Sequence, residues 1–538
     1  MTESRKVFIR DATGLVRNMG VGAGFAYNLI TVGVLLPFTY LLAVYAFPNG
    51  DMAIGFLIAT FFSFFYSVTY ALLSSSLPRS GGEYMFQSRI LSGAVAFPIV
   101  LNGFVIWQIY IQCTLVWTAA NTAIQPLLAF LSVYLNNPGL NDAGNFIITP
   151  NGEMILSVIM LGFVFLMLMK GLRYFVKLMW LFWAGVMISL ALIIFLLASN
   201  TTSSFISSFN SWSAIFNPST PDFYHYVMNN VTQSGISLSY NFNWFDTFGM
   251  GVYAAIVSLF WAMVTCGNLG EIKNATVVKN QVIMVTGGTV VAGVLMVFIG
   301  GLLQHVTGFE FVKAFSYAYT VGSISFPIAP FPASFASVLT HNPIIVTLIM
   351  IGVFFTALNI LFEITVYGTR VAVSMAFDRV LPKALADVSP KWNAPLKAQL
   401  LFFIGGLIGC AIYFYVPNSF YYTLSIYVPT MFSLGITQLS GAIFPFVRKE
   451  TYNASPIARY KVGNVPLITV TGLISFAYLV IAICYMFAVP ALGIVYLWPL
   501  VAIGVTMLLA VLWYFGWKAH QKKKGIDITL AFKEVPPE

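Results

Sequence analysis

The chain has 538 residues, of which 59% are hydrophobic and only 8% are Asp, Glu, Lys or Arg. Soluble domains contain about 25% charged residues, so this composition excludes a soluble globular protein and indicates one that crosses a membrane many times. The net charge of +9 does not indicate nucleic-acid binding, because the basic residues are confined to segments between apolar runs. We therefore expect the lipid bilayer, and no nucleic acid, as the main environment of the chain.

Twelve apolar runs are long enough to cross a bilayer, which takes about 20 helical residues. They cover approximately residues 20–46, 52–76, 92–131, 154–170, 176–198, 246–268, 281–304, 343–368, 398–416, 420–447, 466–488 and 493–516. The third run is longer than one crossing needs, so we expect it to continue as a helix outside the membrane. An even number of crossings places both termini on the same side.

The basic residues alternate with the predicted spans. Of the 26 Lys and Arg residues, all except Lys313 fall in segments that this alternation assigns to one face. Cytoplasmic loops carry such an excess, so the sequence predicts a multi-pass protein of the cell membrane with both termini in the cytoplasm. We expect the basic run Lys522-Lys523-Lys524 to meet anionic headgroups, and the short charged tail to be poorly ordered.

Chain order then predicts six parts. These are a cytoplasmic N-terminus over residues 1–18, spans one to five over 19–200, an extracellular loop over 201–245, spans six to ten over 246–447, spans eleven and twelve over 448–517, and a cytoplasmic tail over 518–538. The four cysteines (Cys113, Cys266, Cys410 and Cys484) lie singly within spans, which indicates packing residues and neither disulfides nor a metal site. We expect no cofactor.

The first span opens with alternate glycines and continues with a polar residue at membrane depth. Each glycine weakens a helix by about 1 kcal/mol relative to alanine, so we expect this stretch to unwind and to form half of a substrate site. The residues of this window are Gly22, Ala23, Gly24, Phe25, Ala26, Tyr27 and Asn28. The alternative, that the glycines only allow close helix packing, stays equally open.

The sixth span, within Trp244–Asn274, has an aromatic pair at its middle and ends in the Gly-rich polar run Cys266–Glu271. A helix interrupted at membrane depth leaves backbone groups unpaired, which is tolerated only where they line a cavity or hold a ligand. We expect the second half of the substrate site here. Its residues are Ser258, Phe260, Trp261, Ala262 and Met263. For either aromatic residue, packing against lipid or core is the alternative.

The eighth span carries polar residues at i, i+3 and i+7, which share one face of a helix: Thr356, Asn359 and Glu363. A carboxylic acid at bilayer depth is costly, so it faces a cavity or a partner and marks a functional site by default. The alternative is that Glu363 is a structural hydrogen-bond or salt-bridge partner that sets the register of the bundle.

Three further stretches are informative in combination. Ser76-Leu77-Pro78-Arg79-Ser80-Gly81-Gly82-Glu83-Tyr84 follows the second span, Glu271-Ile272-Lys273-Asn274 ends the sixth, and a run from Arg370 to Pro382 follows the eighth. In their sequence, order and spacing, these stretches resemble signatures of the amino acid–polyamine–organocation (APC) permeases. The resemblance extends over about residues 10–517.

The resemblance implies an all-α integral membrane protein with twelve transmembrane helices and a five-plus-five inverted repeat, the LeuT/APC-type fold, in which helices one and six are broken. In relatives, a Gly-x-Gly in the unwound part of span one receives the substrate carboxylate, which suits the bare N–H groups of helix N-termini. This chain departs from the pattern: the register falls on Phe25-Ala26-Tyr27, and Met263 replaces the acidic residue of span six. The missing acid disfavours a cationic substrate.

The resemblance leaves the coupling ion open. Sodium-coupled relatives bind the ion between spans one and eight, where Thr356 and Asn359 could contribute, although no Ser/Thr pair is adjacent. In proton-coupled or exchanging relatives a Lys of span five can stand in for the ion. Lys177 is a candidate for that role, but its place near the cytoplasmic end also fits a positive-inside anchor. Glu363 could carry a proton.

The function that this resemblance implies is secondary active transport of amino acids, which we expect to be neutral, by alternating access with proton coupling or exchange. Alternatives are a polyamine or nucleobase carrier of the same fold, or sodium coupling. A channel fits less well, since the sequence has no repeated charge ring or filter-like loop. The chain has no His-Glu-x-x-His, no Cys/His cluster and no nucleophile elbow, so we expect no enzyme and no catalytic residues. The oligomeric state stays open.

Overall fold

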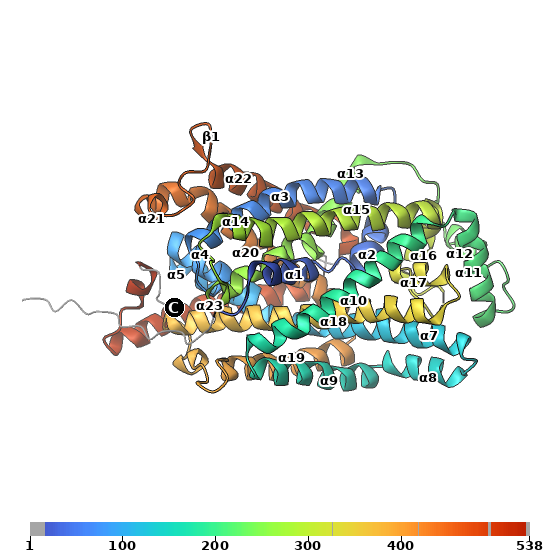
Figure 1. Ribbon diagram of the computed structural model, residues 1–538, viewed down its shortest axis with the longest axis horizontal. Coiled ribbons are helices and arrows are strands. Elements are labelled where there is room, and N and C mark those ends of the chain that lie inside the picture. The colour runs from blue at the N-terminus through green and yellow to red at the C-terminus, as the bar shows by residue number, and fades with distance from the viewer. Residues whose placement is uncertain (1–16, 325, 418, 493–495, 534–538) are drawn as a thin grey trace, which may run out of the picture.

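The computed structural model describes residues 17–324, 326–417, 419–492 and 496–533 of the chain. Its long helices run side by side along the longest axis of the molecule (Figure 1). Two short strands, β1 (Lys461–Val462) and β2 (Val465–Pro466), form an antiparallel hairpin. The described chain is otherwise built from helices and their connections, as the apolar composition predicts.

Eleven helical segments of the described chain are long and apolar enough to cross a membrane. They are Met52–Ser76 (α3), Gly93–Tyr134 (α5 to α7), Pro150–Met169 (α9), Leu172–Ala198 (α10), Trp244–Glu271 (α13 and η3), Val278–Thr307 (α14 to α15), Pro343–Phe377 (α18), Leu396–Tyr415 (α19), Tyr427–Val447 (within α20, Ser419–Val447), Leu467–Ala488 (α22) and Leu497–Lys523 (α23). The predicted first span is divided into two short helices, α1 (Val21–Thr31) and α2 (Phe38–Ala46). Counted as one crossing, it brings the eleven to the twelve expected.

Two of these segments contain π-helical turns. The third segment consists of α5 (Gly93–Leu101), η1 (Asn102–Ile106), α6 (Trp107–Ala119), η2 (Ala120–Ile124) and α7 (Gln125–Tyr134), and the seventh of α14 (Val278–Gln281), η4 (Val282–Gly287) and α15 (Gly288–Thr307). The third run forms one helical segment of 42 residues, Gly93–Tyr134, and its continuation outside the membrane stays a prediction. Single π turns are frequent at functional sites. Here η1 and η2 flank α6, and η4 contacts α1.

Short helices cover the right-hand end of the molecule in Figure 1, which we call the loop end. They are α8 (Pro138–Ile147), α11 (Thr202–Phe216), α12 (Phe223–Gln233), α16 (Phe309–Val321) and α17 (Pro332–Val338), with η6 (Pro490–Leu492) between α22 and α23. Their aromatic side chains pack together: the Phe209 ring lies 5.2 Å from Phe311 and 5.9 Å from Phe315. The long external segments are therefore packed helices.

The opposite end, which we call the tail end, holds α4 (Gly82–Ile90), η5 (Lys383–Ala386), α21 (Lys449–Asn453) and η7 (Ile528–Lys533). The expectation of a poorly ordered tail is wrong for its described part. The Phe532 side chain is 6% exposed, and its ring lies 5.7 Å from the Arg89 guanidinium carbon. A Cβ on Gly93 would lie only 2.1 Å from this ring, so the glycine allows the tail to pack closely.

Helix α1 lies in the middle of the bundle, with α10 and α18 crossing beside it (Figure 1). Every residue of α1 from Ala26 to Thr31 is buried, although the helix is only two to three turns long. Such a short helix is not stable alone, so its conformation depends on the surrounding helices. The centre of this bundle is where the polar groups of the first, sixth and eighth segments meet.

Candidate functional site

The first membrane segment is interrupted between Thr31 and Phe38. Within the break, Gly33 has a φ of +65°, a left-handed conformation that glycine adopts without steric cost. Pro37 precedes α2 and has no N–H group to continue the first helix. The Tyr40 hydroxyl donates to the Val34 carbonyl at 2.8 Å. This side chain therefore satisfies one of the carbonyls that the break leaves without a helical partner.

The predicted position of this break is wrong. Residues Gly22 to Asn28 are helical. Gly24 serves close packing, since a Cβ there would lie 2.3 Å from the Met284 sulfur, whereas a Cβ on Gly22 would meet no atom within 4 Å. The Asn28 side chain donates to the Thr265 hydroxyl and to the Met284 carbonyl, both at 2.9 Å, and accepts from the Thr265 N–H at 3.1 Å. Asn28 thus ties α1 to the sixth and seventh segments.

The sixth segment is also interrupted, and it changes helix type. Helix α13 (Trp244–Val257) ends at Ser258, whose φ of −126° and ψ of −71° are not helical. The chain continues as η3 (Leu259–Glu271), a 3-10 helix of 13 residues, whereas runs beyond 3–4 residues are uncommon. The Ser258 and Thr39 hydroxyls are 2.7 Å apart. This hydrogen bond joins the break of segment six to the first turn of α2.

A cavity lies beside the two breaks, and about 490 Å³ between its walls is free of protein atoms, a volume that includes its opening to solvent. Its lining comprises Thr31, Leu36, Phe38, Gln108, Ile111, Thr114, Leu115, Thr118, Val257, Trp261, Ile360, Ile364 and Tyr427. The lining side chains are mostly apolar, the remainder are neutral polar groups, and none carries a charge. Binding pockets for small molecules have this mixture of apolar walls and a few polar groups.

Among the residues predicted in segment six, only Trp261 lines this cavity. Its indole N–H donates to the Ile256 carbonyl at 3.0 Å, and its ring lies 6.4 Å from the Tyr427 ring. The neighbouring Phe260 side chain is fully buried and lies 4.7 Å from the Tyr66 ring. Ala262 and Met263 are fully buried in η3. The Phe260 side chain is thus packed in the core, which is the alternative that the sequence left open.

Sequence reasoning missed the contribution of the third segment. Gln108, Thr114 and Thr118 of α6 all line the cavity. These polar residues recur within an apolar run at spacings that bring them to adjoining faces of one helix. This pattern is visible in the sequence and could have pointed to the lining residues. Tyr427 of α20 had no comparable signal, because one hydroxyl-bearing ring within an aromatic-rich span is not distinctive.

Glu363 lies in a group of buried polar side chains that we call the polar strip: Tyr27, Asn268, Asn359, Glu363 and Tyr367. All five are at most 2% exposed. The Thr31 hydroxyl, at the cavity, is hydrogen-bonded to Glu363 Oε2. Each member of the strip has at least one side-chain polar atom without a hydrogen-bond partner in the described protein. Buried polar groups normally acquire such a partner, commonly water.

The remaining two coupling candidates, Thr356 and Lys177, have surroundings unlike those of Glu363. The Thr356 hydroxyl donates to the Gly352 carbonyl of its own helix at 3.0 Å. The Lys177 side chain is exposed on α10, whereas Asn359 and Glu363 are fully buried. The exposed position of Lys177 agrees with its alternative role as a positive-inside anchor.

Two buried ion pairs close the bundle at the tail end. Arg370 of α18 donates from Nε and NH2 to the two carboxylate oxygens of Glu271 in η3, at 2.8 and 2.9 Å, and both side chains are 2% exposed. Asp378 accepts from Arg89 at 2.5 and 2.9 Å and from the Tyr84 hydroxyl at 2.9 Å. The sequence stretches singled out for the resemblance are therefore in direct contact with one another.

Comparison with protein families matches residues 23–509 to the amino acid permeases. The chain belongs to the amino acid permease family. This match supports membership of the APC superfamily and makes the chain a multi-pass membrane transporter. A permease moves a small molecule and is not an enzyme. A comparison with curated proteins finds no match for the chain.

Gly33 provides a test of the break in the permease's first segment. Gly33→Val is expected to lower the stability of the purified protein, because a β-branched residue at a φ of +65° costs roughly 1–2 kcal/mol in backbone strain. Gly33→Asn is the control, since asparagine tolerates this conformation. Thermal unfolding in detergent measures both. Equal melting temperatures for the Val and Asn variants would contradict the left-handed break.

We expect the free energy of unfolding to depend on pH through the buried Glu83 of α4. Burial raises the pKa of its carboxyl group from 4.5 to about 7, even though the Tyr70 hydroxyl donates to it at 2.7 Å. The folded state then binds the proton more tightly than the unfolded state, so stability is greatest at low pH and falls as the pH rises from about 4.5 through 7.

The expected loss over that interval is at most about 3 kcal/mol, from 1.36 kcal/mol per pKa unit. Glu83→Gln, which stays neutral, should flatten this part of the profile. Melting temperatures of both proteins over this pH range measure the difference. Parallel profiles would show that Glu83 does not titrate there.

Proposed function

We propose that this permease is a secondary active transporter that moves neutral amino acids with apolar side chains across the cell membrane by alternating access. The observation that carries the proposal is the uncharged cavity beside the two interrupted segments. Family membership supports amino acids as the substrate class. The positive-inside pattern supports an orientation in which the tail end, where the described chain begins and ends, faces the cytoplasm.

The breaks supply groups for the charged ends of an amino acid. The N–H groups of Val34 and Leu35 lie in the first break and donate to no acceptor within the described chain. Bare N–H groups beside a helix start suit a carboxylate. At the second break, the Ile256 carbonyl accepts from the Trp261 indole, whereas the Ala255 and Val257 carbonyls have no continuing α-helix to donate to them and suit an ammonium group.

The cavity walls favour a particular kind of substrate side chain. Ile111, Leu115, Ile360 and Ile364 are aliphatic, and Trp261 adds an aromatic wall. An apolar side chain gains free energy when it leaves water for such surroundings. A charged side chain would be buried without a counter-charge, which is costly. This contrast supports neutral over cationic or acidic amino acids, and over polyamines.

For coupling, we propose that Glu363 carries a proton. Thr31 both lines the cavity and is hydrogen-bonded to this carboxyl group, so substrate binding and protonation share one contact. The polar strip continues from Glu363 to Tyr367, one turn nearer the tail end, and to Asn268 in η3. Sodium coupling has less support, because Thr356 has no adjacent Ser or Thr that could supply a second hydroxyl ligand.

Uptake into proteoliposomes tests the proposal. Labelled leucine, alanine, lysine, glutamate, a polyamine and a nucleobase would each be offered, and we expect leucine to be taken up in preference to lysine and glutamate. Trp261→Ala should raise the KM for leucine about tenfold or more, because removal of a buried aromatic wall costs a few kcal/mol.

Phe260→Ala is the matched control, since it removes the adjacent buried aromatic residue outside the cavity lining. It should lower the stability of the protein and leave the KM for leucine unchanged. Uptake of lysine or the polyamine in place of leucine would contradict a neutral substrate, and uptake of the nucleobase alone would support the other substrate class on this fold.

A further inference from the structure

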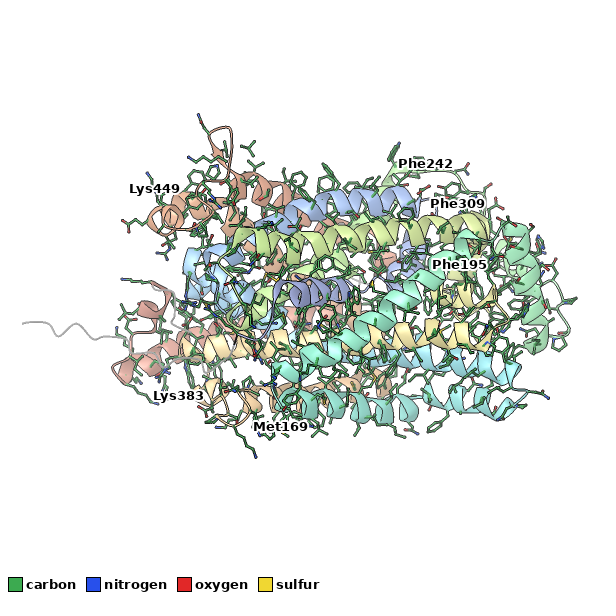
Figure 2. All side chains as sticks on the ribbon, viewed as in Figure 1. Met169, Phe195, Phe242, Phe309, Lys383 and Lys449 are labelled. Carbon is green, nitrogen blue, oxygen red and sulfur yellow. The ribbon has the colours of Figure 1, made fainter. Side chains whose placement is uncertain are left out.

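A second cavity lies at the tail end of the molecule, apart from the central one. About 740 Å³ between its walls is free of protein atoms, a volume that includes its opening to solvent. The cavity lies between the turn from α9 to α10 and the segment that precedes α19. Figure 2 labels Met169, the residue before this turn, at the lower edge of the molecule. The lining includes Lys170 and Arg173 of the turn, Lys391 and Trp392 of the segment, Asn18 before α1, and Glu271.

The cavity has an excess of positive charge. Lys170, Arg173 and Lys391 form no ion pair with any carboxylate in the described chain. Glu271 lies at the same cavity, but both of its oxygens accept hydrogen bonds from Arg370, so its charge is already compensated. Basic residues near membrane-span ends often serve only as orientation anchors. These three, however, converge on one cavity from two separate segments.

The backbone adds to this positive potential. Helix α10, 27 residues long, begins directly after Gly171 and has no side-chain cap. The positive end of its dipole therefore lies at the cavity and favours an anion. Gly171 has a φ of +92°, and a Cβ there would lie 2.6 Å from the Trp392 carbonyl oxygen. The glycine thus lets the two basic walls approach closely.

We infer that this cavity binds a phosphate-bearing anion. Arg and Lys side chains with a helix N-terminus form the donor set that phosphate groups accept from in proteins. The cavity lies directly after the end of α9, a helix long and apolar enough to cross a membrane, so we expect it at the level of the lipid headgroups. An indole ring beside the basic residues is also common at this level. The phosphate could belong to an anionic lipid headgroup or to a soluble cytoplasmic phosphate.

Occupancy of this site has a consequence for transport, which rests on the proposed function. Asn18 precedes α1, and its N–H donates to the Glu271 carbonyl at 2.9 Å. A bound anion would therefore bridge the chain before α1, the start of α10 and the segment that precedes α19. These elements must separate if the tail end opens to the cytoplasm, so we expect the anion to slow opening on that side.

Binding to the purified full-length protein tests the inference independently of transport. The variant is Lys170→Ala/Arg173→Ala/Lys391→Ala. The control, Lys279→Ala/Lys449→Ala/Lys461→Ala, removes three exposed basic residues elsewhere on the tail end. The probes are a short-chain phosphatidylglycerol and inorganic phosphate, with binding measured by native mass spectrometry and by calorimetry, and folding by the melting temperature.

We expect the wild type and the control to bind phosphatidylglycerol alike, and the cavity variant to bind roughly a hundredfold more weakly, from about fivefold per basic residue. Arg173→Ala alone should weaken binding about fivefold. Binding of inorganic phosphate with the same dependence on these residues would identify the soluble ion as the source. Equal binding by the cavity variant and the control, or no binding of either probe to the wild type, would overturn the inference.

Discussion

Arg370→Ala is expected to lower the free energy of unfolding by about 3–5 kcal/mol, because it leaves the buried Glu271 carboxylate without its counter-charge. Arg370 and Glu271 are both 2% exposed and share two hydrogen bonds of 2.8 and 2.9 Å. Water cannot replace the guanidinium group at such a site without rearrangement. Thermal and denaturant unfolding of the purified protein in detergent measures the loss.

The matched control for this prediction is Lys397→Ala. Lys397 also pairs with a carboxylate, Asp387 at 2.7 Å, but the two side chains are 59% and 51% exposed. Exposed pairs contribute about 1 kcal/mol or less. A double replacement of Arg370 and Glu271 by methionine should cost less than Arg370→Ala, since it leaves no charge behind. If Arg370→Ala lowers the free energy of unfolding no more than Lys397→Ala does, the Arg370–Glu271 pair does not stabilise the tail end.

Glu363→Gln is expected to abolish accumulation of a neutral amino acid driven by a proton gradient. Glutamine has nearly the same shape and can still hydrogen-bond to Thr31, but it cannot bind and release a proton at this position. Exchange of labelled for unlabelled substrate at equal pH on both sides should persist, because it needs the cavity and not the gradient. Proteoliposomes with an imposed pH gradient and a counterflow assay measure the two activities.

Glu153→Gln provides the comparison for Glu363. Glu153 is a second buried carboxylate, 6% exposed in α9, where it accepts from Asn121 at 2.6 Å. It contributes to neither the cavity nor the polar strip. We expect this variant to accumulate substrate like the wild type. If Glu363→Gln also accumulates substrate normally, Glu363 serves only as a structural hydrogen-bond partner within the bundle. The coupling group then lies elsewhere.

Local sequence identified the membrane segments but misplaced the breaks. The glycines at 20, 22 and 24 and the Gly33–Pro37 pair are both able to weaken a helix. Their neighbours differ in the folded chain: the Met284 side chain packs against Gly24 within the helical α1, whereas the Tyr40 hydroxyl donates to the Val34 carbonyl in the unwound stretch. Such choices depend on long-range contacts, which sequence periodicity does not record.

The candidate site shows the same division between local and long-range information. Glu363 was identifiable because a carboxylic acid within an apolar run is costly wherever it lies. Its partner Thr31 was not, since the two are 332 positions apart and a hydroxyl within a span has no such cost. The lining residues of α6 were overlooked for a related reason: threonine can satisfy its hydroxyl within its own helix, so its presence alone predicts no site.

The sequence by itself determined that this protein is a multi-pass α-helical transporter of the APC type, because the length and number of apolar runs follow from the thickness of the bilayer, and because the family signatures are local. Only the tertiary structure decided where the helices break, which side chains enclose the cavity, and that Arg370 pairs with Glu271. The physical reason is that each of these features is a balance between groups on separate helices. Their free energy exists only when the bundle is assembled.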